Sequence, residues 1–181
     1  VIGELELAFR LAGVPTLAVT GTNGKSTTTA LCAHLLERAG MKVFLGGNIG
    51  RPLSELLLAH EGERSKLDWA VVEVSSFQLE HLSSPAGFAP WIGVWLNLTP
   101  DHLDRHGDMT AYAATKRRMF EGLDGDDRGV FFLDDERVRS AADGLACGRL
   151  GFGRAPARLG DGDAQIEGAR VQLAGRTLRL N

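Results

Sequence analysis

The chain has few of the residues that mark several common classes of protein. It contains two cysteines among 181 residues, Cys32 and Cys147, and neither has the spacing of a metal site or a disulfide framework. Its formal net charge is −3, so no excess of positive charge favours nucleic acid or an anionic membrane as a partner. We find no signal peptide and no apolar run long enough to span a bilayer. These absences predict a cytoplasmic protein.

What the chain does contain fits one domain with an ordinary core. Of its residues 44% are hydrophobic and 24% are charged, a balance typical of a compact domain of this length. The chain opens at Val1 and ends on Asn181, directly after a strand-like run. We therefore expect a piece of a longer protein.

The most informative segment is a glycine-rich loop between a predicted strand and a predicted helix. The apolar run Leu17–Val19 leads into the sequence TGTNGKST at residues 20–27. Glycines allow the backbone N–H groups to close around phosphate oxygens, and a helix N-terminus adds partial positive charge. The predicted nucleotide-binding residues are Gly21, Thr22, Asn23, Gly24, Lys25, Ser26 and Thr27. An ordinary turn between strand and helix is the alternative, and Val19 stands where the general motif has a further glycine.

The helix after this loop is predicted to end at Gly40 and to bury one apolar stripe. Its members are Leu31, Cys32, Leu35, Leu36 and Ala39.

Further segments alternate between helix and strand patterns. We predict helices over residues 2–12, 52–60 and 110–123, and strands over residues 42–45, 69–74, 91–98 and 129–133. Apolar strands that alternate with helices predict an α/β fold, with a mostly parallel sheet flanked by helices as in phosphate-loop NTPases. Ligands of such sheets bind at the carboxyl ends of the strands.

The last part of the chain changes character. From residue 151 it is rich in Gly, Arg and Asp, with short strand-like runs separated by Gly-containing turns. We predict one domain over residues 1–181, with an α/β core at 1–150 and a small antiparallel β-meander at 151–181.

Glu73 stands near the end of an apolar strand, where an acid can assist Mg²⁺ binding at a phosphate loop. A charge at the rim of the sheet is the alternative. Ser75, Ser76 and Gln78 follow it and are candidates for orienting nearby groups. Asn48 lies between glycines in the segment GGNIG and is predicted to face the same sheet edge, although a plain strand-to-helix turn would explain it too.

A polar cluster follows the strand at 91–98. It comprises Asp101, His102, Asp104 and His106. Histidine there can bind a metal or hold a carboxylate, whereas a local turn with solvated histidines explains the same spacing. A metallohydrolase would also carry such a cluster, but a metallohydrolase function does not explain the phosphate loop.

Lys116 falls on the inward stripe of the helix at 110–123, three residues after Ala113 and four before Phe120. Arg117 and Arg118 fall off that stripe, toward solvent. A lysine directed inward is costly unless it is paired or chemically altered, or unless its ammonium reaches back to the surface.

Four short segments occur in an order that resembles the central ATP-binding domain of the Mur ligases. They read TGTNGKST at 20–27, GGNIG at 46–50, EVSSFQLE at 73–80 and NLTPDHLD at 97–104. The resemblance runs from about Gly21 to Lys116, and its SSFQL segment is most similar to the member that joins D-glutamate to UDP-N-acetylmuramoyl-L-alanine. It implies a monomeric enzyme of peptidoglycan synthesis that uses ATP and two Mg²⁺ ions.

The resemblance also implies a reaction and a set of residue roles. ATP phosphorylates the substrate carboxylate, the amine of D-glutamate attacks the acyl phosphate, and amide, ADP and phosphate result. Lys116 matches a family lysine that CO₂ carbamylates. The implied catalytic residues are Lys25, Glu73, His102 and Lys116; the implied metal-site residues are Ser26, Thr27, Glu73, His102 and Lys116; and the implied substrate-binding residues are Asn48, Ser75 and Gln78.

Family members have three domains, and the N-terminal uridine-binding and C-terminal ligase domains are expected outside this chain. We therefore expect the chain to fold but not to complete the reaction alone. Two other interpretations stay open: another amide ligase of the superfamily, such as a different Mur ligase or folylpolyglutamate synthase, or a nucleotide-binding module without catalysis.

Overall fold

The computed structural model describes residues 2–58, 62 and 66–154, together with the backbone of 164–167, 170–173 and 176–179. The strands form one sheet in the order β2-β3-β1-β4-β5-β6-β7-β8-β9, and the first six of these are parallel. Their bounds are β1 Thr16–Thr20, β2 Val43–Gly47, β3 Trp69–Glu73, β4 Ile92–Trp95, β5 Arg128–Phe132 and β6 Gly148–Gly153. The predicted parallel α/β sheet is confirmed.

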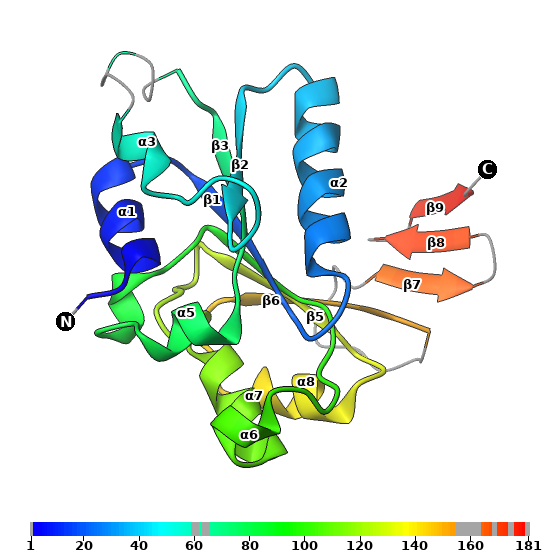
Figure 1. Ribbon diagram of the computed structural model, residues 1–181. Helices are drawn as coiled ribbons and strands as arrows, with labels where there is room; N and C mark the ends of the chain where they lie inside the picture. The colour runs from blue at the N-terminus through cyan, green and yellow to red at the C-terminus, as the bar shows by residue number, and fades with distance from the viewer. Residues whose placement is uncertain are drawn as a thin grey trace.

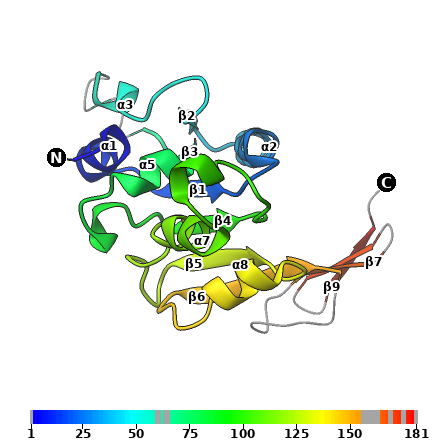
Figure 2. The same cartoon turned by 60° about the horizontal axis from the view of Figure 1, so that its bottom comes forward.

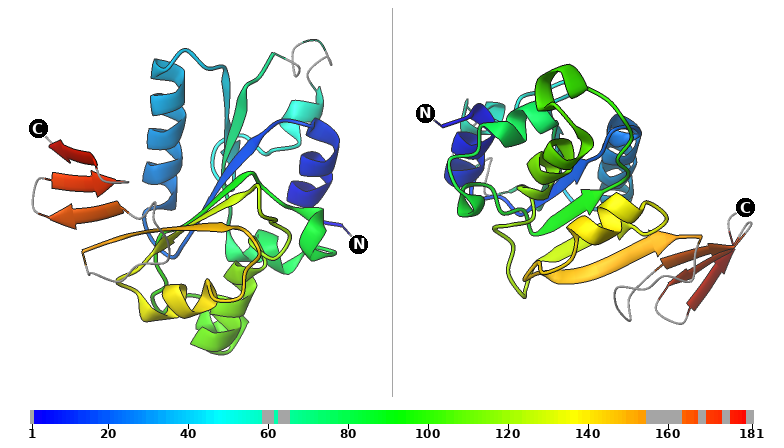
Figure 3. Two further views of the ribbon diagram at one scale, coloured as in Figure 1. Left: turned by 180° about the vertical axis from the view of Figure 1, so that it is seen from behind. Right: turned by 90° about the horizontal axis from the view of Figure 1, so that it is seen from below.

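Helices lie on both sides of the strands. They are α1 Glu4–Ala12, α2 Lys25–Arg38, α3 Glu55–Leu58, α5 Ser76–Glu80, α6 Leu103–His106, α7 Met109–Arg117 and α8 Glu136–Ala141, with the short 3₁₀ helix η1 Pro85–Gly87. Figure 1 and the left view of Figure 3 show β1, β2 and β3 between α2 on one side and α1 with α3 on the other. In Figure 1, α5, α6 and α7 gather at the opposite end from α3.

The core forms because the central strands are apolar along their whole length. Ala18, Val71 and Val72 are fully buried, as expected for parallel strands covered on both faces. On the α7 side, Trp95 stacks on Phe120 with ring centroids 5.8 Å apart. Gly93 lies beneath Phe120, since a Cβ there would stand 2.7 Å from that ring. The missing side chain in β4 therefore lets α7 and the turn after it approach the sheet.

The predicted apolar stripe is not the buried face of α2: Leu31, Leu35 and Ala39 are exposed, and Cys32 and Leu36 are half-buried. Leu31 and Leu35 are 54% and 58% exposed, whereas Thr29 and Ala33 are the buried residues of this helix. Small side chains allow the helix axis to approach the sheet closely, and the Thr29 hydroxyl is satisfied by donating to the Lys25 carbonyl at 2.8 Å. The larger leucines are left on the outer face.

Other element boundaries also differ from the predictions. The helix expected from residue 52 begins at Glu55, after a turn in which the Glu55 N–H donates to the Pro52 carbonyl, and residues 59–60 lie outside the described part. The helix expected over 110–123 ends at Arg117 and continues as turns. Three short helices (α5, α6 and α8) and β6 were not predicted, because segments of four to six residues carry little periodicity.

The end of the chain holds three short strands, β7 Ala164–Glu167, β8 Arg170–Leu173 and β9 Arg176–Arg179. β7 pairs parallel with β6, and β8 and β9 follow in antiparallel pairing. They extend the sheet past β6, away from the helices around α7 (Figure 2). β6 itself runs three residues past position 150. The residues that join these strands lie outside the described part, so the meander and the division at 150 stay predictions.

Across the described residues, no helix combines the length and apolar character that a membrane crossing needs.

Candidate functional site

Strand order brings the predicted site residues to one edge of the sheet. β1 lies between β3 and β4, and Val19 is in register with both Glu73 and Val94. Because the three strands are parallel, the segments that follow them meet at their carboxyl ends. The phosphate loop after β1 thus lies between Glu73 of β3 and the polar segment after β4.

The phosphate loop has the backbone that its sequence requires. Gly24 caps α2 in the left-handed region at φ 80°, a conformation that a side chain would strain. The helix begins at Lys25, so its first N–H groups lack partners within the helix. The Lys25 Nζ donates to the Thr22 carbonyl at 2.8 Å, which folds this side chain over its own loop. The positive charge of Lys25 and the N–H groups of the first turn of α2 therefore lie close together at the loop.

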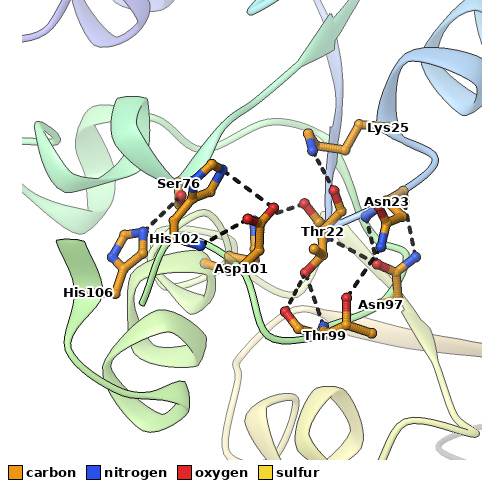
Figure 4. Close-up of polar contacts among 11 residues, drawn as sticks. Thr22, Asn23, Lys25, Ser76, Asn97, Thr99, Asp101, His102 and His106 are labelled. Carbon is orange, nitrogen blue, oxygen red and sulfur yellow. Dashed lines mark hydrogen bonds and ion pairs between the residues drawn. The ribbon is translucent and has the colours of Figure 1, made fainter. Parts of the chain in front are cut away.

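The segment after β4 holds the loop in shape (Figure 4). The Asn97 Oδ1 accepts from the backbone N–H groups of Thr22 at 3.1 Å and Asn23 at 2.9 Å, and its Nδ2 donates to the Asn23 carbonyl at 2.9 Å. The Thr22 Oγ1 donates to the Thr99 carbonyl at 3.2 Å and accepts from the Thr99 N–H at 3.0 Å. We did not predict roles for Asn97 and Thr99. Their signal lay in the NLTP segment, but only the strand order shows which loop they contact.

Glu73 is 2% exposed and has two partners from separate elements. Its Oε2 accepts from the Ser26 Oγ at 2.6 Å, and its Oε1 accepts from the Asn48 Nδ2 at 2.9 Å. Gly47 makes the second contact possible, since a Cβ there would stand 2.3 Å from the Glu73 carbonyl oxygen. The structure thus brings Glu73, Ser26 and Asn48 together as predicted. Thr27 lies beside them on the exposed first turn of α2.

The predicted polar cluster after β4 separates into two parts. His102 has a side chain 45% exposed and adopts φ 51°, the single non-glycine residue of the described chain with positive φ. Its Nε2 lies 3.5 Å from the Asp101 Oδ2. His106 instead has a side chain 3% exposed and contacts Ser76 and Glu80. Asp104 is exposed.

This separation bears on the metallohydrolase alternative. Among the described residues, no three His, Cys, Asp or Glu side chains are grouped closely enough to hold a metal ion. The cluster at 101–106 therefore is not a ready-made site of histidine and carboxylate ligands.

Lys116 is 1% exposed, which confirms the predicted inward direction. Its Nζ donates to the Gly21 carbonyl at 2.9 Å and lies 4.7 Å from the centre of the Tyr112 ring. Burial, and to a lesser degree the nearby charge of Lys25, lower the pKa of Lys116 to about 7, while Asp101 opposes the change. Snorkelling to the surface is thereby contradicted, and Lys116 presents an amine with a fraction in the neutral form near neutral pH.

The neighbouring arginines do not simply face solvent, so that prediction was wrong. Arg117 donates to the carbonyls of Ala141 and Asp143, and Arg118 donates to the carbonyls of Glu80 and Leu82. Both side chains are partly buried because their guanidinium groups satisfy chain ends of neighbouring elements.

Two adjoining pockets open at this edge of the sheet. One of about 160 Å³ is lined by Lys25, Asn48, Ser76, His102, Tyr112 and Lys116, among others. The second, of about 360 Å³, shares Asn48 and Ser75 with the first and adds Gln78 and α1 residues. Ser75 and Gln78 also form the capping box of α5, in which the Ser75 N–H donates to the Gln78 Oε1 at 3.0 Å. Their local structural role was not predicted.

Comparison with known proteins agrees with this geometry. The Mur ligase middle domain family matches residues 19–175. A relative from Nitratidesulfovibrio vulgaris strain DP4, named UDP-N-acetylmuramoylalanine--D-glutamate ligase, is 52% identical over 132 residues, which are 72% of this chain and 29% of the relative. A relative of the same name from Syntrophotalea carbinolica is 39% identical over 181 residues, 99% of this chain and 38% of the relative. The chain thus spans about a third of the length of these curated relatives.

Solved structures show the same fold. MurF ligase from Thermotoga maritima in complex with ADP superposes with a TM-score of 0.69 at 20% identity, over 96% of this chain and 43% of that one. E. coli FolC in complex with DHPP and ADP gives a TM-score of 0.66 at 16% identity, over 98% of this chain and 52% of that one.

Proposed function

This chain belongs to the Mur ligase middle domain family, and from that premise we propose that it is the ATP-binding catalytic domain of a UDP-N-acetylmuramoylalanine--D-glutamate ligase. The relatives that carry this name are up to 52% identical, whereas the FolC match rests on 16% identity and the fold. The observation that carries the proposal is the buried Lys116, whose Nζ contacts the phosphate loop at Gly21 from 95 positions along the chain.

The nucleotide would lie on the loop at residues 21–27. The backbone N–H groups at the start of α2 and the Lys25 ammonium supply donors and positive charge for its phosphates. Asn97 fixes the shape of the loop by accepting from the N–H groups of Thr22 and Asn23, so the first N–H groups of α2 stay available to the phosphates. The Thermotoga maritima MurF structure, which shares the fold, was solved with ADP.

The residues at the loop also fit magnesium. Mg²⁺ prefers oxygen ligands, and the Ser26 Oγ and Glu73 Oε2 already lie 2.6 Å apart. We propose that Ser26 or Thr27 serves one ion with Glu73, and that His102 and a modified Lys116 serve a second. When bound, Mg²⁺ would neutralise charge that develops on the transferred phosphoryl group.

Lys116 is suited to the proposed carbamylation. Its neutral amine can attack CO₂, form an N–C bond and lose one proton, which leaves a carbamate. The change converts a buried cation beside Lys25 into an anion, and so removes the repulsion between two like charges. It would also give this edge of the sheet another oxygen ligand.

The proposed reaction joins two substrates across the adjoining pockets. The carboxylate of UDP-N-acetylmuramoyl-L-alanine accepts the γ-phosphoryl group of ATP, the D-glutamate amine displaces phosphate from the acyl phosphate, and the amine loses a proton as the amide forms. Lys25 would stabilise the negative charge of the phosphoryl group during transfer. Asn48, Ser75 and Gln78 would contact the muramoyl substrate in the larger pocket.

Because the chain spans about a third of its relatives, we propose that it does not form the amide alone. The uridine and D-glutamate contacts would come from further domains. We also propose a cytoplasmic, monomeric enzyme whose partners are these small molecules, with no nucleic acid or membrane partner, in keeping with a net charge of −3.

Calorimetric titration with Mg·ATP tests the proposal at its first step. We expect saturable binding that Lys25→Ala abolishes and that Lys42→Ala, a change at an exposed lysine outside the site, preserves. A folded chain that binds no nucleotide, or a Lys25→Ala variant that binds as well as the parent, would contradict the phosphate-loop assignment. A three-domain ligase carrying this chain should then use D-glutamate in preference to L-lysine or a folate substrate.

A further inference from the structure

We propose that Glu80 and His106 form a positioning pair that orients the Ser76 hydroxyl and the Tyr112 ring at one wall of the Lys116 pocket. The pair touches neither the phosphate loop nor the larger pocket, and its importance for catalysis rests on the proposed function. Its geometry stands on the described side chains alone.

His106 has a polar partner at each ring nitrogen and two aromatic rings stacked with it. Its Nε2 lies 3.0 Å from the Ser76 Oγ, and its Nδ1 lies 3.2 Å from the Glu80 Oε1. The ring stacks on Tyr112 with centroids 4.7 Å apart and on Phe77 with centroids 6.1 Å apart. With its side chain 3% exposed, the imidazole has little freedom to rotate.

Glu80 is fixed in turn by Arg105. The Arg105 Nε donates to both carboxylate oxygens of Glu80, at 2.8 and 3.1 Å, and its Nη2 lies 2.7 Å from Oε2. This hydrogen bonding, more than the opposing effect of burial, holds the pKa of Glu80 below its usual value. Glu80 is therefore a carboxylate at neutral pH, which can accept hydrogen bonds but not donate them.

The carboxylate beside Nδ1 decides which His106 nitrogen is protonated, and so which way the His106–Ser76 hydrogen bond points. The Glu80 carboxylate lies at Nδ1, and the Ser76 hydroxyl, which can donate as well as accept, lies at Nε2. A ring proton on Nδ1 then faces the Glu80 Oε1, 3.2 Å away. The Nε2 lone pair then accepts from the Ser76 hydroxyl, which leaves the lone pairs of the Ser76 Oγ for a donor on the pocket side.

The Glu80–His106 pair sets the position of the Tyr112 side chain. Thr22 and Ser76 are the polar side chains that act on its hydroxyl, and the face of its ring lies 4.7 Å from the Lys116 Nζ. His106 thus acts on Tyr112 twice, by stacking on the ring and by orienting Ser76. Both effects keep the ring over the buried lysine, so His106 is a positioning residue and does not itself touch the pocket's contents.

The tautomer of His106 tests the inference directly. Long-range ¹H–¹⁵N spectra of the chain should show a protonated Nδ1 and an unprotonated Nε2 for His106, with exposed His34 as reference in the same spectrum. We expect Ser76→Ala to leave this tautomer unchanged, and Glu80→Ala to give a mixture. A proton on Nε2 in the parent, or a tautomer that responds to Ser76→Ala but not to Glu80→Ala, would overturn the proposal.

The hydroxyl of Tyr112 supplies a second readout, because Tyr112 is the only tyrosine of the chain. Fluorotyrosine incorporation therefore gives one ¹⁹F resonance. We expect His106→Phe, which keeps stacking and loses the polar contacts with Ser76 and Glu80, to shift this resonance. His106→Gln, which offers an amide acceptor, should restore it in part, and His34→Phe should leave it in place. If His106→Phe left the resonance unmoved, His106 would not position Tyr112. Neither measurement needs nucleotide or ligase activity, so failure here is separable from failure of the proposed function.

Discussion

Replacing Lys116 by Met should make the folded chain more stable at neutral pH, although it removes a site residue. The folded state lowers the pKa of Lys116 from its ordinary value of 10.5 to about 7, chiefly by burial. Between pH 7 and 10.5 the unfolded chain therefore binds more protons than the folded chain, and stability contributed by this residue rises with pH. Below pH 7 Lys116 is protonated in both states, so burying its charge lowers the free energy of unfolding by a constant, maximal amount.

The size of the effect follows from the same difference. At 1.36 kcal/mol for each pKa unit, burying the lysine costs about 4 to 5 kcal/mol at pH 7. Methionine fills a similar volume without charge, but it leaves the Gly21 carbonyl without its donor, which costs about 1 kcal/mol. We therefore expect a net stabilisation of about 3 kcal/mol at pH 7, falling to zero at roughly pH 10.

Urea denaturation at several pH values between 6 and 10 measures this difference. The buffers must be free of CO₂, because a carbamate on Lys116 would remove the charge whose cost is measured. Lys42→Met is the matched control, since Lys42 is exposed and its substitution should give no comparable pH-dependent difference. A Lys116→Met variant that is less stable than the parent at pH 7, or whose advantage does not shrink as the pH rises, would refute the reasoning.

Three further predictions concern other parts of the site and its frame. Glu73→Gln keeps the volume but removes the anionic oxygen beside Ser26, so calorimetry should show ATP binding that no longer gains from Mg²⁺; an undiminished Mg²⁺ effect would speak against Glu73 as a ligand. Gly47 has φ 102°, and a Cβ there would stand 2.3 Å from a backbone oxygen, so Gly47→Ala should lower the free energy of unfolding in urea by more than about 3 kcal/mol. Gly13 has φ 62° with open space around it, so Gly13→Ala should cost only about 1 kcal/mol. Equal losses for the two glycine variants would count against the close approach of β2 and β3. Glu6 is fully buried, and hydrogen bonds from Ser83 with the charge of Arg10 lower its pKa despite the opposing effect of burial; Glu6→Gln should therefore lower the melting temperature at pH 7, by an amount that shrinks as the pH falls below 4.5. A difference that grows toward acid pH would show that the sign is wrong.

The sequence alone determined the strand-loop-helix unit at the phosphate loop, the parallel α/β class and the inward direction of Lys116. These follow from local physics: apolar strands buried on both faces, glycines that permit the turn, and the 3.6-residue period that places Lys116 on the stripe of Tyr112 and Phe120. The same reasoning failed on α2. Hydrophobicity predicted Leu31 and Leu35 inside, but close packing against the sheet selected the smaller Thr29 and Ala33.

Only the tertiary structure decided which loops meet. The strand order β2-β3-β1-β4 is a property of the whole sheet. Because β1 lies between β3 and β4, Asn97 holds the phosphate loop and Glu73 contacts Ser26. Because β2 lies on the other side of β3, Glu73 also contacts Asn48. The histidines behave likewise. His102 and His106 stand four residues apart, yet the short helix between them leaves one exposed at the pocket and the other buried against Ser76 and Glu80. Spacing along the chain does not contain that difference, because it depends on which neighbouring elements pack against each ring.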